Sequence, residues 1–460
     1  MKIDYKHTIA LIYTVVLFLD RLDLTIVNIT LPTLASYFHV PIVNTTWVSL
    51  AFLIALAVSI PISSWLGDRF GLKKIYVIAI VLFGLGSTLC AIAPNLLMLT
   101  FFRFIQGIGG GLLIPVGMTM LYRAFDSAEY ASITSFTFIP TLIAPAIAPF
   151  LGGILLDAFG WQAVFLFSGP ICLILACYAT IYLKETAEKI IKPLDWVGFF
   201  LTTVMLIDLF LTLSAISQFG FSLVVILAII LFIILLTIFI EWETTIQHPL
   251  IQLDFFKNKQ IVQANLMQLC FQYCHFGALF LIVMYLQVGV GMQAEVAGLI
   301  IGMQAVGAMV SSRLSVKLFN LYGAKTPLTI GLFGLIILSP SILFITHPNM
   351  ILFGIILFFV RGLFSGLCGT PLQTMSVINM PKENLNQINS IFNTCRQIAI
   401  SLGVAISSVL ISLGLKLAHI DKANYMTHHQ ALTVFLPGFI AVSVVAFVGI
   451  LIMDLNKKAS

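Results

Sequence analysis

The sequence predicts an all-α polytopic membrane protein. Of its 460 residues, 60% are hydrophobic and only 9% are charged, whereas a soluble domain has about 25% charged residues. The apolar residues gather in fourteen runs. Each run is long enough for a membrane-spanning helix, which takes about 20 residues. Composition and run length together fit no other class of protein.

The fourteen runs fall into three groups along the chain. Six of them come first, at 9–37, 46–66, 74–93, 96–121, 130–156 and 163–183. Two follow between polar stretches, at 196–216 and 220–240. Six close the chain, at 261–289, 295–318, 326–346, 349–376, 388–415 and 432–454. We therefore expect an N-terminal six-helix bundle over 1–183, two additional helices with cytoplasmic linkers over 184–259, and a C-terminal six-helix bundle over 260–460.

The basic residues predict the orientation in the membrane. With a cytoplasmic N-terminus, 17 of the 23 Lys and Arg residues fall in the termini and cytoplasmic loops, and only Lys416 and Lys422 fall in the opposite loops. Cytoplasmic loops of membrane proteins are enriched in Lys and Arg. The bias places both termini in the cytoplasm, and it explains the net charge of +5 without a nucleic-acid partner.

The two six-helix groups resemble each other. Gly71 after the second run and Gly323 after the tenth both follow an aromatic residue and precede a Lys two positions on, and they lie 252 positions apart. Gln106-Gly107 in the fourth run and Arg361-Gly362 in the twelfth lie 255 apart. Two parallel repeats with a cargo site between them near the midplane are a known plan of membrane transporters.

Ionisable residues lie near the middle of the first run. Asp20, Arg21 and Asp23 are spaced so that both acids point to one side of a helix. A charge at this depth costs roughly 3 kcal/mol or more, so it normally faces a cavity or a partner and marks a transport path. The alternative is that Asp20 and Arg21 only neutralise each other near a loose helix end.

Three more stretches carry polar or helix-bending residues. Gly67-Asp68-Arg69-Phe70-Gly71-Leu72-Lys73-Lys74 predicts a tight, charged cytoplasmic turn. The run from Arg103 to Gly111 places a cation beside glycines that let another helix approach closely. The stretch from Ala144 to Gly153 has Pro145 and Pro149, and each proline removes a helical hydrogen bond and bends the helix.

Together these stretches resemble the major facilitator superfamily, and most closely its fourteen-helix drug:proton antiporter family. The loop, the fourth-run and the fifth-run stretches are similar to the family's cytoplasmic-loop, proton-coupling and exporter motifs. Further similarities are at Leu22–Pro32, Asp195–Gly198, Tyr285–Gln287 with Ala297–Leu299, and Asn393–Gln397 with Gly403–Ala405. The resemblance covers nearly the whole chain and implies two six-helix bundles, two central helices and alternating access.

The resemblance also implies roles for individual residues. Proton coupling is expected at Asp23, Asp20 and Arg103. The polar residues expected in the cargo cavity are Arg21, Asn28, Gln106, Arg361, Arg396 and Gln397. A cytoplasmic gating loop is expected at Gly67, Asp68, Arg69, Gly71 and Lys73, and the helix-bending exporter motif at Pro145, Pro149, Gly152 and Gly153.

The sequence departs from the family pattern at four places. Ala144 and Ala148 stand where the fifth-helix motif usually has glycine, which puts the closeness of that helix contact in doubt. Asp20-Arg21 stands where related exporters usually have uncharged residues. Asp208 lies inside the seventh run with no assigned role, and Asn320-Leu321 replaces Asp-Arg in the second copy of the loop motif.

The predicted function is proton-coupled export of small molecules, foremost drugs and toxic compounds, from a bacterial inner membrane. The alternative is an exporter of an anionic metabolite such as a carboxylate siderophore, because the spans hold four arginines and arginine binds carboxylates bidentately. Uptake is a third reading, against which the fifth-run prolines argue. A periplasmic adaptor is left open, and a monomer is expected.

The sequence has no motif of an enzyme. We expect no catalytic residue, no cofactor, no metal and no nucleic-acid partner. Cys270, Cys274 and His275 could suggest a soft metal site, but one helical turn of packing residues is the favoured reading. A non-transporting membrane sensor would share the fold, and a flux assay separates it from a transporter.

Overall fold

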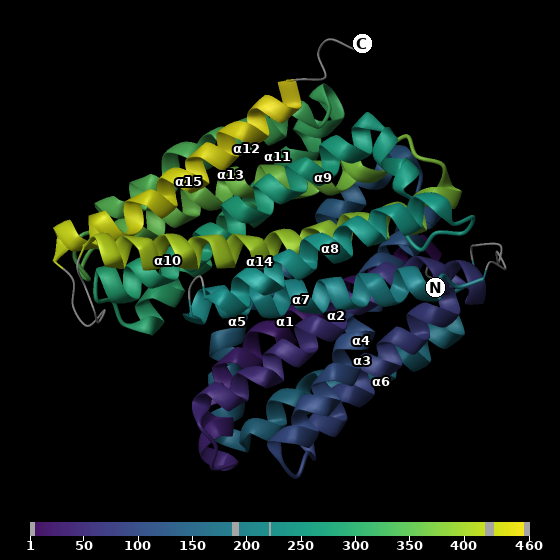
Figure 1. Cartoon of the computed structure of the whole chain (residues 1–460), viewed down its shortest axis with the longest axis horizontal. Helices are drawn as coiled ribbons and strands as arrows, with labels where there is room; N and C mark the ends of the chain where they lie inside the picture. Colours follow the sequence, from purple (N-terminus) through teal and green to yellow (C-terminus); the bar gives the residue numbers. More distant parts are fainter. Residues whose placement is uncertain (1–4, 186–192, 220–221, 419–426, 455–460) are drawn as a thin grey trace. The chain divides into compact units, whose positions relative to one another are not determined.

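The computed structural model describes residues 5–185, 193–219, 222–418 and 427–454, and the regular elements in these ranges are helices. Six come before the central pair: α1 (Tyr5–Tyr37), α2 (Ile42–Phe70), α3 (Leu72–Ala91), α4 (Leu96–Ala124), α5 (Tyr130–Phe159) and α6 (Trp161–Tyr182). The central pair is α7 (Trp196–Phe219) and α8 (Leu223–Thr245). The rest are α9 (Lys259–Gln272), α10 (Ala278–Met284), α11 (Ala294–Tyr322), α12 (Lys325–Leu338), α13 (Ile351–Val377), α14 (Leu385–Leu417) and α15 (His428–Asp454) (Figure 1).

Short helical segments join or interrupt these helices. Two are π-helices, η3 (Tyr273–Gly277) and η4 (Tyr285–Gly289), and they continue α9 and α10 into one span from Lys259 to Gly289. The 3-10 helices are η1 (Ser127–Glu129), η2 (Leu253–Lys257), η5 (Pro340–Phe344) and η6 (Lys382–Asn384).

The predicted count of fourteen spans is not confirmed. Among the described residues, 12 helices are long and apolar enough to cross a membrane, and the bent helix α5 makes a thirteenth if its two parts are one span. Helix α1 is 33 residues long. It carries Asp20, Arg21 and Asp23 near its middle, so length and composition alone do not assign it to the membrane.

The chain divides into two compact units. Unit 1 comprises Met1–Ile207, Leu235–Leu253 and Val377–Thr394, and unit 2 comprises Asp208–Ile234, Asp254–Ser376 and Cys395–Ser460. Helices α7, α8 and α14 thus each contribute to both units. The boundaries after residues 183 and 259, which come from the spacing of apolar runs, stay predictions.

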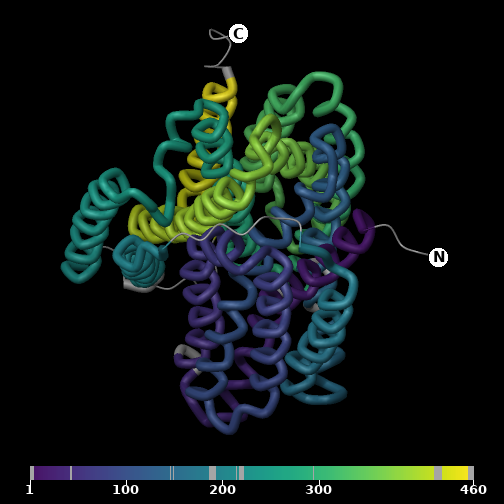
Figure 2. The backbone as a smooth tube through the Cα atoms, turned by 90° about the vertical axis from the view of Figure 1, so that its right-hand side faces the viewer, coloured from purple at the N-terminus to yellow at the C-terminus, as the bar shows by residue number. Residues whose placement is uncertain are grey.

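Close contacts at glycines organise unit 1. A side chain at Gly107 would collide with the backbone carbonyl of Phe52, and one at Gly111 with the carbonyl of Leu56, so α4 lies directly against α2. On another face, Gly109 lies as close to the backbone of Phe83 on α3. The purple and blue tubes of α1 to α4 accordingly run alongside one another (Figure 2). Small residues allow this approach where lipid supplies no hydrophobic driving force.

Close contacts at glycines also bring helices together in unit 2. Gly362 on α13 lies against the backbone of Gln304 on α11, and Gly307 on α11 lies against the backbone of Phe359 on α13. The turn glycines that the repeat predicts to be equivalent also agree, since Gly71 has a φ of 96° and Gly323 a φ of 73°. Both values lie in the left-handed region that favours glycine.

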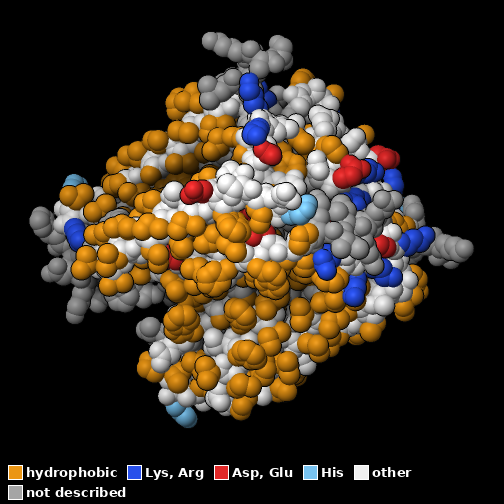
Figure 3. Space-filling view, turned by 45° about the vertical axis from the view of Figure 1, so that its right-hand side comes forward, with side chains coloured by type: hydrophobic (Ala, Val, Ile, Leu, Met, Phe, Trp, Pro, Cys, Tyr) orange, Lys and Arg blue, Asp and Glu red, His pale blue; other side chains and the backbone are white. Residues whose placement is uncertain are grey.

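The surface suits a lipid environment. Hydrophobic side chains cover most of the face in view in Figure 3. Over residues 223–240, helix α8 is almost entirely apolar and mostly exposed, with Leu223 72%, Val224 74% and Ile233 55% exposed. A helix with such a surface is stable only where its surroundings are apolar too.

Candidate functional site

A closed polar triangle lies inside unit 1. Arg103 on α4 donates from Nη1 to Asp23 Oδ2 on α1 at 2.5 Å and to Gln106 Oε1 at 2.7 Å. Gln106 in turn donates from Nε2 to Asp23 Oδ1 at 3.0 Å. All three side chains are at most 2% exposed. The charges are therefore compensated within the protein and shielded from lipid.

The surroundings of this triangle fix the arginine. Its Nε donates to the carbonyl of Val48 on α2 at 3.3 Å, and its guanidinium lies 4.3 Å from the ring centre of Phe52. Helix α2 reaches these positions because Gly107 admits it so closely. A cation over an aromatic face in a buried site is held by the ring quadrupole as well as by its hydrogen bonds.

The second acid of α1 lies one turn away on the same side. Asp20 is fully buried, and its Oδ2 lies 3.5 Å from Nε of Arg21. A Cβ at Gly110 on α4 would lie 3.1 Å from Asp20 Oδ1, so this acid also faces α4. Asp20 and Asp23 thus share one face of α1, as their spacing predicts. Arg21, which was expected in the cargo cavity, is the ion-pair partner of Asp20.

Asn28 lies apart from both acids. Its side chain is exposed within the structure and accepts a hydrogen bond from Ser49 on α2 at 2.8 Å. Its place in a cargo cavity stays a prediction.

A second polar cluster lies inside unit 2. Arg361 on α13 is fully buried and donates to the amide oxygen of Gln304 on α11 and, at 2.9 Å, to the carbonyl of Cys274 in η3. The amide nitrogen of Gln304 lies 3.3 Å from Nδ1 of His275. Arg396 and Gln397 are half-buried on α14.

Sequence reasoning missed two members of this cluster. Gln304 was not singled out, and His275 was expected only to pack. A signal for His275 existed, because it lies 252 positions after Asp23, the same offset that relates Gly71 to Gly323. By this offset the first repeat holds an acid, Asp23, at the position where the second holds His275.

The predicted gating loop contacts the start of α14 inside unit 1. Asn386 donates from Nδ2 to Asp68 Oδ1 at 2.9 Å and to the carbonyl of Ser64 at 2.7 Å. Gly67 admits this side chain, because a Cβ there would lie 2.8 Å from Asn386 Nδ2. Ser390, one turn further along α14, donates a hydrogen bond to the carbonyl of Ile60. Asn389 donates a hydrogen bond to the hydroxyl oxygen of Thr119. These three residues of α14 were not foreseen.

The remaining loop residues serve the turn itself. Gly71 caps α2, and the first amide of α3, that of Leu72, donates to Glu185 Oε1 at 3.0 Å. The guanidinium of Arg69 lies 5.4 Å from the Trp65 ring. Lys73 is half-buried at the start of α3.

The predicted exporter motif bends α5. Its parts Ser127–Pro145 and Phe150–Phe159 differ in direction by 51°. Gly152 faces α1, where its Cβ would lie 3.0 Å from Ile26, whereas Gly153 has open space around it. The side chain of Pro149 lies outside what the structure describes. Ala144 and Ala148 are fully buried in a cluster with Ile26 and Val27, so alanine at these positions does not prevent packing against α1.

Acidic residues also anchor the central helices. Asp195 Oδ1 accepts from the amide of Gly198 at 2.8 Å and from Trp242 Nε1 at 2.9 Å, which ties the start of α7 to the end of α8. Glu243 accepts from the amide of Ile251 at 3.2 Å. Asp208 is half-buried on α7, and nothing in its surroundings assigns it a role.

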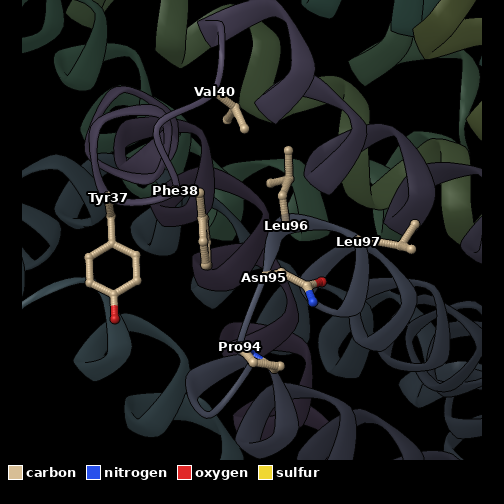
Figure 4. Close-up of a pocket in the computed structure, with 7 residues that line it drawn as sticks. All are labelled: Tyr37, Phe38, Val40, Pro94, Asn95, Leu96 and Leu97. Atoms are coloured by element: carbon tan, nitrogen blue, oxygen red, sulfur yellow. The ribbon is translucent and has the colours of Figure 1, made fainter.

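A surface cavity of about 590 Å³ lies between the loop after α1 and the start of α4 (Figure 4). Its lining is Tyr37, Phe38, Val40 and the segment from Pro94 to Leu97. None of the predicted site residues lines it. The buried polar clusters, rather than this cavity, are therefore the candidate sites.

The comparisons with known proteins agree with this architecture. A protein of Yersinia pestis (strain Pestoides F) described as "Putative multidrug resistance protein MdtD" is 28% identical over 439 residues, which is 95% of this chain and 93% of that protein. Its namesake from Yersinia enterocolitica is 28% identical over 397 residues, covering 86% and 84%.

Two solved structures share the fold. The proton:xylose symporter XylE matches with a TM-score of 0.67 and 14% identity over 98% of this chain and 95% of that one. The human organic anion transporter MFSD10 matches with a TM-score of 0.67 and 13% identity over 98% and 100%. The family model "Major Facilitator Superfamily" matches residues 13–404. The chain is therefore a multi-pass membrane transporter and not an enzyme, and it belongs to the major facilitator superfamily.

Proposed function

We propose that this transporter is a proton-coupled exporter of small molecules, with drugs and other toxic compounds as its main cargo. The observation that carries the proposal is the buried ion pair between Asp23 and Arg103. Ionisable residues are expensive inside a membrane span, and those that occur there commonly serve ion or proton pathways. The 28% identity to relatives named for multidrug resistance supports the cargo class.

Asp23 is the proposed proton carrier. As a carboxylate it accepts hydrogen bonds from Arg103 and Gln106. A proton on either oxygen removes the negative charge and one acceptor site, which weakens the contact of α1 with α4. Arg103 then stands without its counterion, so the protonated site favours a rearrangement of the two helices. Asp20, one turn away and also facing α4, assists by accepting or passing the proton.

The direction of transport is proposed from the bend in α5. The exporter-type stretch bends that helix and packs it against α1, the helix that carries both acids. We place the protein in a bacterial inner membrane with both termini in the cytoplasm, because of its basic loops and its bacterial relatives. The proposal needs no periplasmic adaptor.

The test uses inside-out vesicles with an imposed pH gradient and a fluorescent cationic dye such as ethidium. Asp23→Asn is expected to abolish gradient-driven dye uptake while the protein remains in the membrane. The matched control is Asp157→Asn, which removes an exposed acid near the end of α5 and is expected to transport normally. Dye uptake by Asp23→Asn at the wild-type rate would refute the role of Asp23.

A second cargo class is an anionic metabolite such as a carboxylate siderophore. The observation that favours it is Arg361, a fully buried cation that donates hydrogen bonds to two neutral groups, the amide oxygen of Gln304 and the carbonyl of Cys274. Comparing efflux of a cationic dye with efflux of a carboxylate from the same vesicles separates the two classes.

A further inference from the structure

The buried cation of unit 2, Arg361, lacks the carboxylate partner that Arg103 has in unit 1. Arg103 is paired with Asp23, whereas Arg361 contacts an amide oxygen and a backbone carbonyl. Its Nε has no partner among the described residues. A buried charge without a counterion is strongly unfavourable, so a protein that keeps one generally has a use for it.

No acid of the second half can supply the missing charge from within a span. From residue 260 onward the sequence has four acids: Glu295, Glu383, Asp421 and Asp454. Glu295 is in the first turn of α11, Glu383 is in the short helix η6, and Asp454 ends α15. Asp421 lies outside the described residues. Asp208 on α7 also belongs to unit 2, but among the described residues Arg361 contacts Gln304 and the carbonyl of Cys274, and Asp208 Oδ2 has no hydrogen-bond partner. The counterion of Arg361 is therefore expected to come from outside the protein.

The surroundings of Arg361 are built to hold it in place. Gly362 and Gly307 bring the backbones of α13 and α11 together, which sets Arg361 beside Gln304. The π-helix η3 presents the carbonyl of Cys274 to the guanidinium. Single-turn π-helices frequently occur at functional sites. Across the same region, Ser407 on α14 donates to the carbonyl of Gly277 at 3.0 Å, which holds the helix of Arg396 next to η3.

The hydrogen bonds also determine the tautomer of His275, that is, which ring nitrogen carries the proton. Because the Gln304 oxygen accepts from Arg361, its amide nitrogen faces His275 Nδ1 and donates to it. The ring proton of the neutral imidazole then lies on Nε2 and can be donated to an anion. His275 is half-buried, whereas Arg361 and Gln304 are buried.

We propose that Arg361, Gln304 and His275 form the binding site for a carboxylate group of the cargo. The Gln304 oxygen stands where a carboxylate oxygen binds. An arriving carboxylate replaces it, takes two parallel hydrogen bonds from the guanidinium and a third from His275 Nε2. This inference rests on the second cargo class of the proposed function, because it specifies the residues that bind an anionic cargo.

The test is equilibrium binding to the purified full-length protein in lipid nanodiscs, without any pH gradient. The probes are 1-naphthoate and 1-naphthylmethylammonium, which share a ring system and carry opposite charges. The wild type is expected to prefer naphthoate. Arg361→Gln is expected to weaken naphthoate binding by about tenfold or more, the usual effect of losing charge-assisted hydrogen bonds, and to leave ammonium binding as strong or stronger.

The matched control is Arg313→Gln, which removes an exposed arginine from α11 and is expected to bind both probes as the wild type does. Arg361→Lys keeps the charge but loses the planar fork, so it is expected to bind naphthoate more weakly than the wild type. This second variant serves as the test if Arg361→Gln does not fold.

Thermal unfolding distinguishes a binding role from a structural one. Removal of an uncompensated buried cation is expected to leave the melting temperature of Arg361→Gln unchanged or raised. Equal binding of the two probes by the wild type, or unchanged naphthoate binding by both Arg361 variants, would overturn the inference. Because this assay needs no gradient, the wild type is expected to prefer naphthoate whether or not Asp23 couples transport to protons. Failure of the Asp23→Asn dye-transport test would therefore refute the proton-coupling proposal and leave this inference standing.

Discussion

At the scale of single residues, two buried arginines differ in whether a carboxylate compensates their charge. Arg103 has a carboxylate within 2.5 Å, and Gln106 bridges the pair. The partners of Arg361 among the described residues are neutral. The loss of stability on replacing either arginine depends on whether a charged partner remains buried, because a buried charge without a counterion is less favourable than no buried charge.

The first pair therefore predicts non-additive stability changes. Arg103→Met alone is expected to destabilise the protein by about 3 kcal/mol, because Asp23 would remain buried without its cation. Adding Asp23→Leu removes that charge too, so the double variant is expected to be more stable than Arg103→Met. Thermal unfolding of the wild type, both single variants and the double variant measures the coupling energy. Additive effects would show that the pair does not act as one unit.

At the scale of elements, glycines decide how closely helices pack. Gly111 on α4 lies against the carbonyl of Leu56 on α2, whereas Gly153 on α5 has no atom close to the position of an added Cβ. Both residues lie in helices, so the effects of their replacement by alanine on stability differ mainly because of the space available for the added Cβ. The contrast separates the packing role of a glycine from its effect on helix propensity.

Gly111→Ala is expected to destabilise unit 1 by about 2 kcal/mol, because α2 must move away to make room. Gly153→Ala is the matched control and is expected to be neutral or stabilising by up to about 1 kcal/mol, the gain in helix propensity. Thermal unfolding in the same detergent compares the two. A similar loss of stability in both variants would contradict the packing argument.

At the scale of the whole molecule, the number of spans determines where the termini lie. An even number places both termini on one side of the membrane, and an odd number places them on opposite sides. The composition of the helices accounts for 12 or 13 spans, and α1 is the helix in question because of its three ionisable residues. The basic loops favour an even number.

Reporter fusions test this count. Green fluorescent protein fused after Ser460 is expected to fluoresce in the cytoplasm, and an epitope tag before Met1 is expected to resist protease added to spheroplasts. Alkaline phosphatase fused after Lys416 is expected to be active, because that loop should face outward. A fluorescent C-terminus together with a protease-sensitive N-terminal tag would show that α1 does not cross the membrane.

The sequence predicted the helical elements and the membrane class well, because both follow from local composition. It also placed Asp20 and Asp23 on one helix face, since that relation depends only on spacing. It could not predict which side chains meet across helices. The partnership of Arg361 with Gln304, and of Asp68 with Asn386, joins residues 57 and 318 positions apart. Such contacts depend on which helices pack against each other, and the positions of apolar runs in the sequence do not determine that packing.

The exposure of α8 has a consequence for how this chain varies among its relatives. Residues 223–240 of α8, before the hydrogen-bonded Trp242 and Glu243, are almost entirely apolar and mostly exposed, so this part of the helix makes few specific contacts and its neighbours are mostly acyl chains. Exchanges among leucine, isoleucine, valine and phenylalanine should be silent there, while a single charged replacement should be rejected. Substitutions should therefore accumulate fastest in α8, and its divergence between species would record neutral drift rather than a change of cargo.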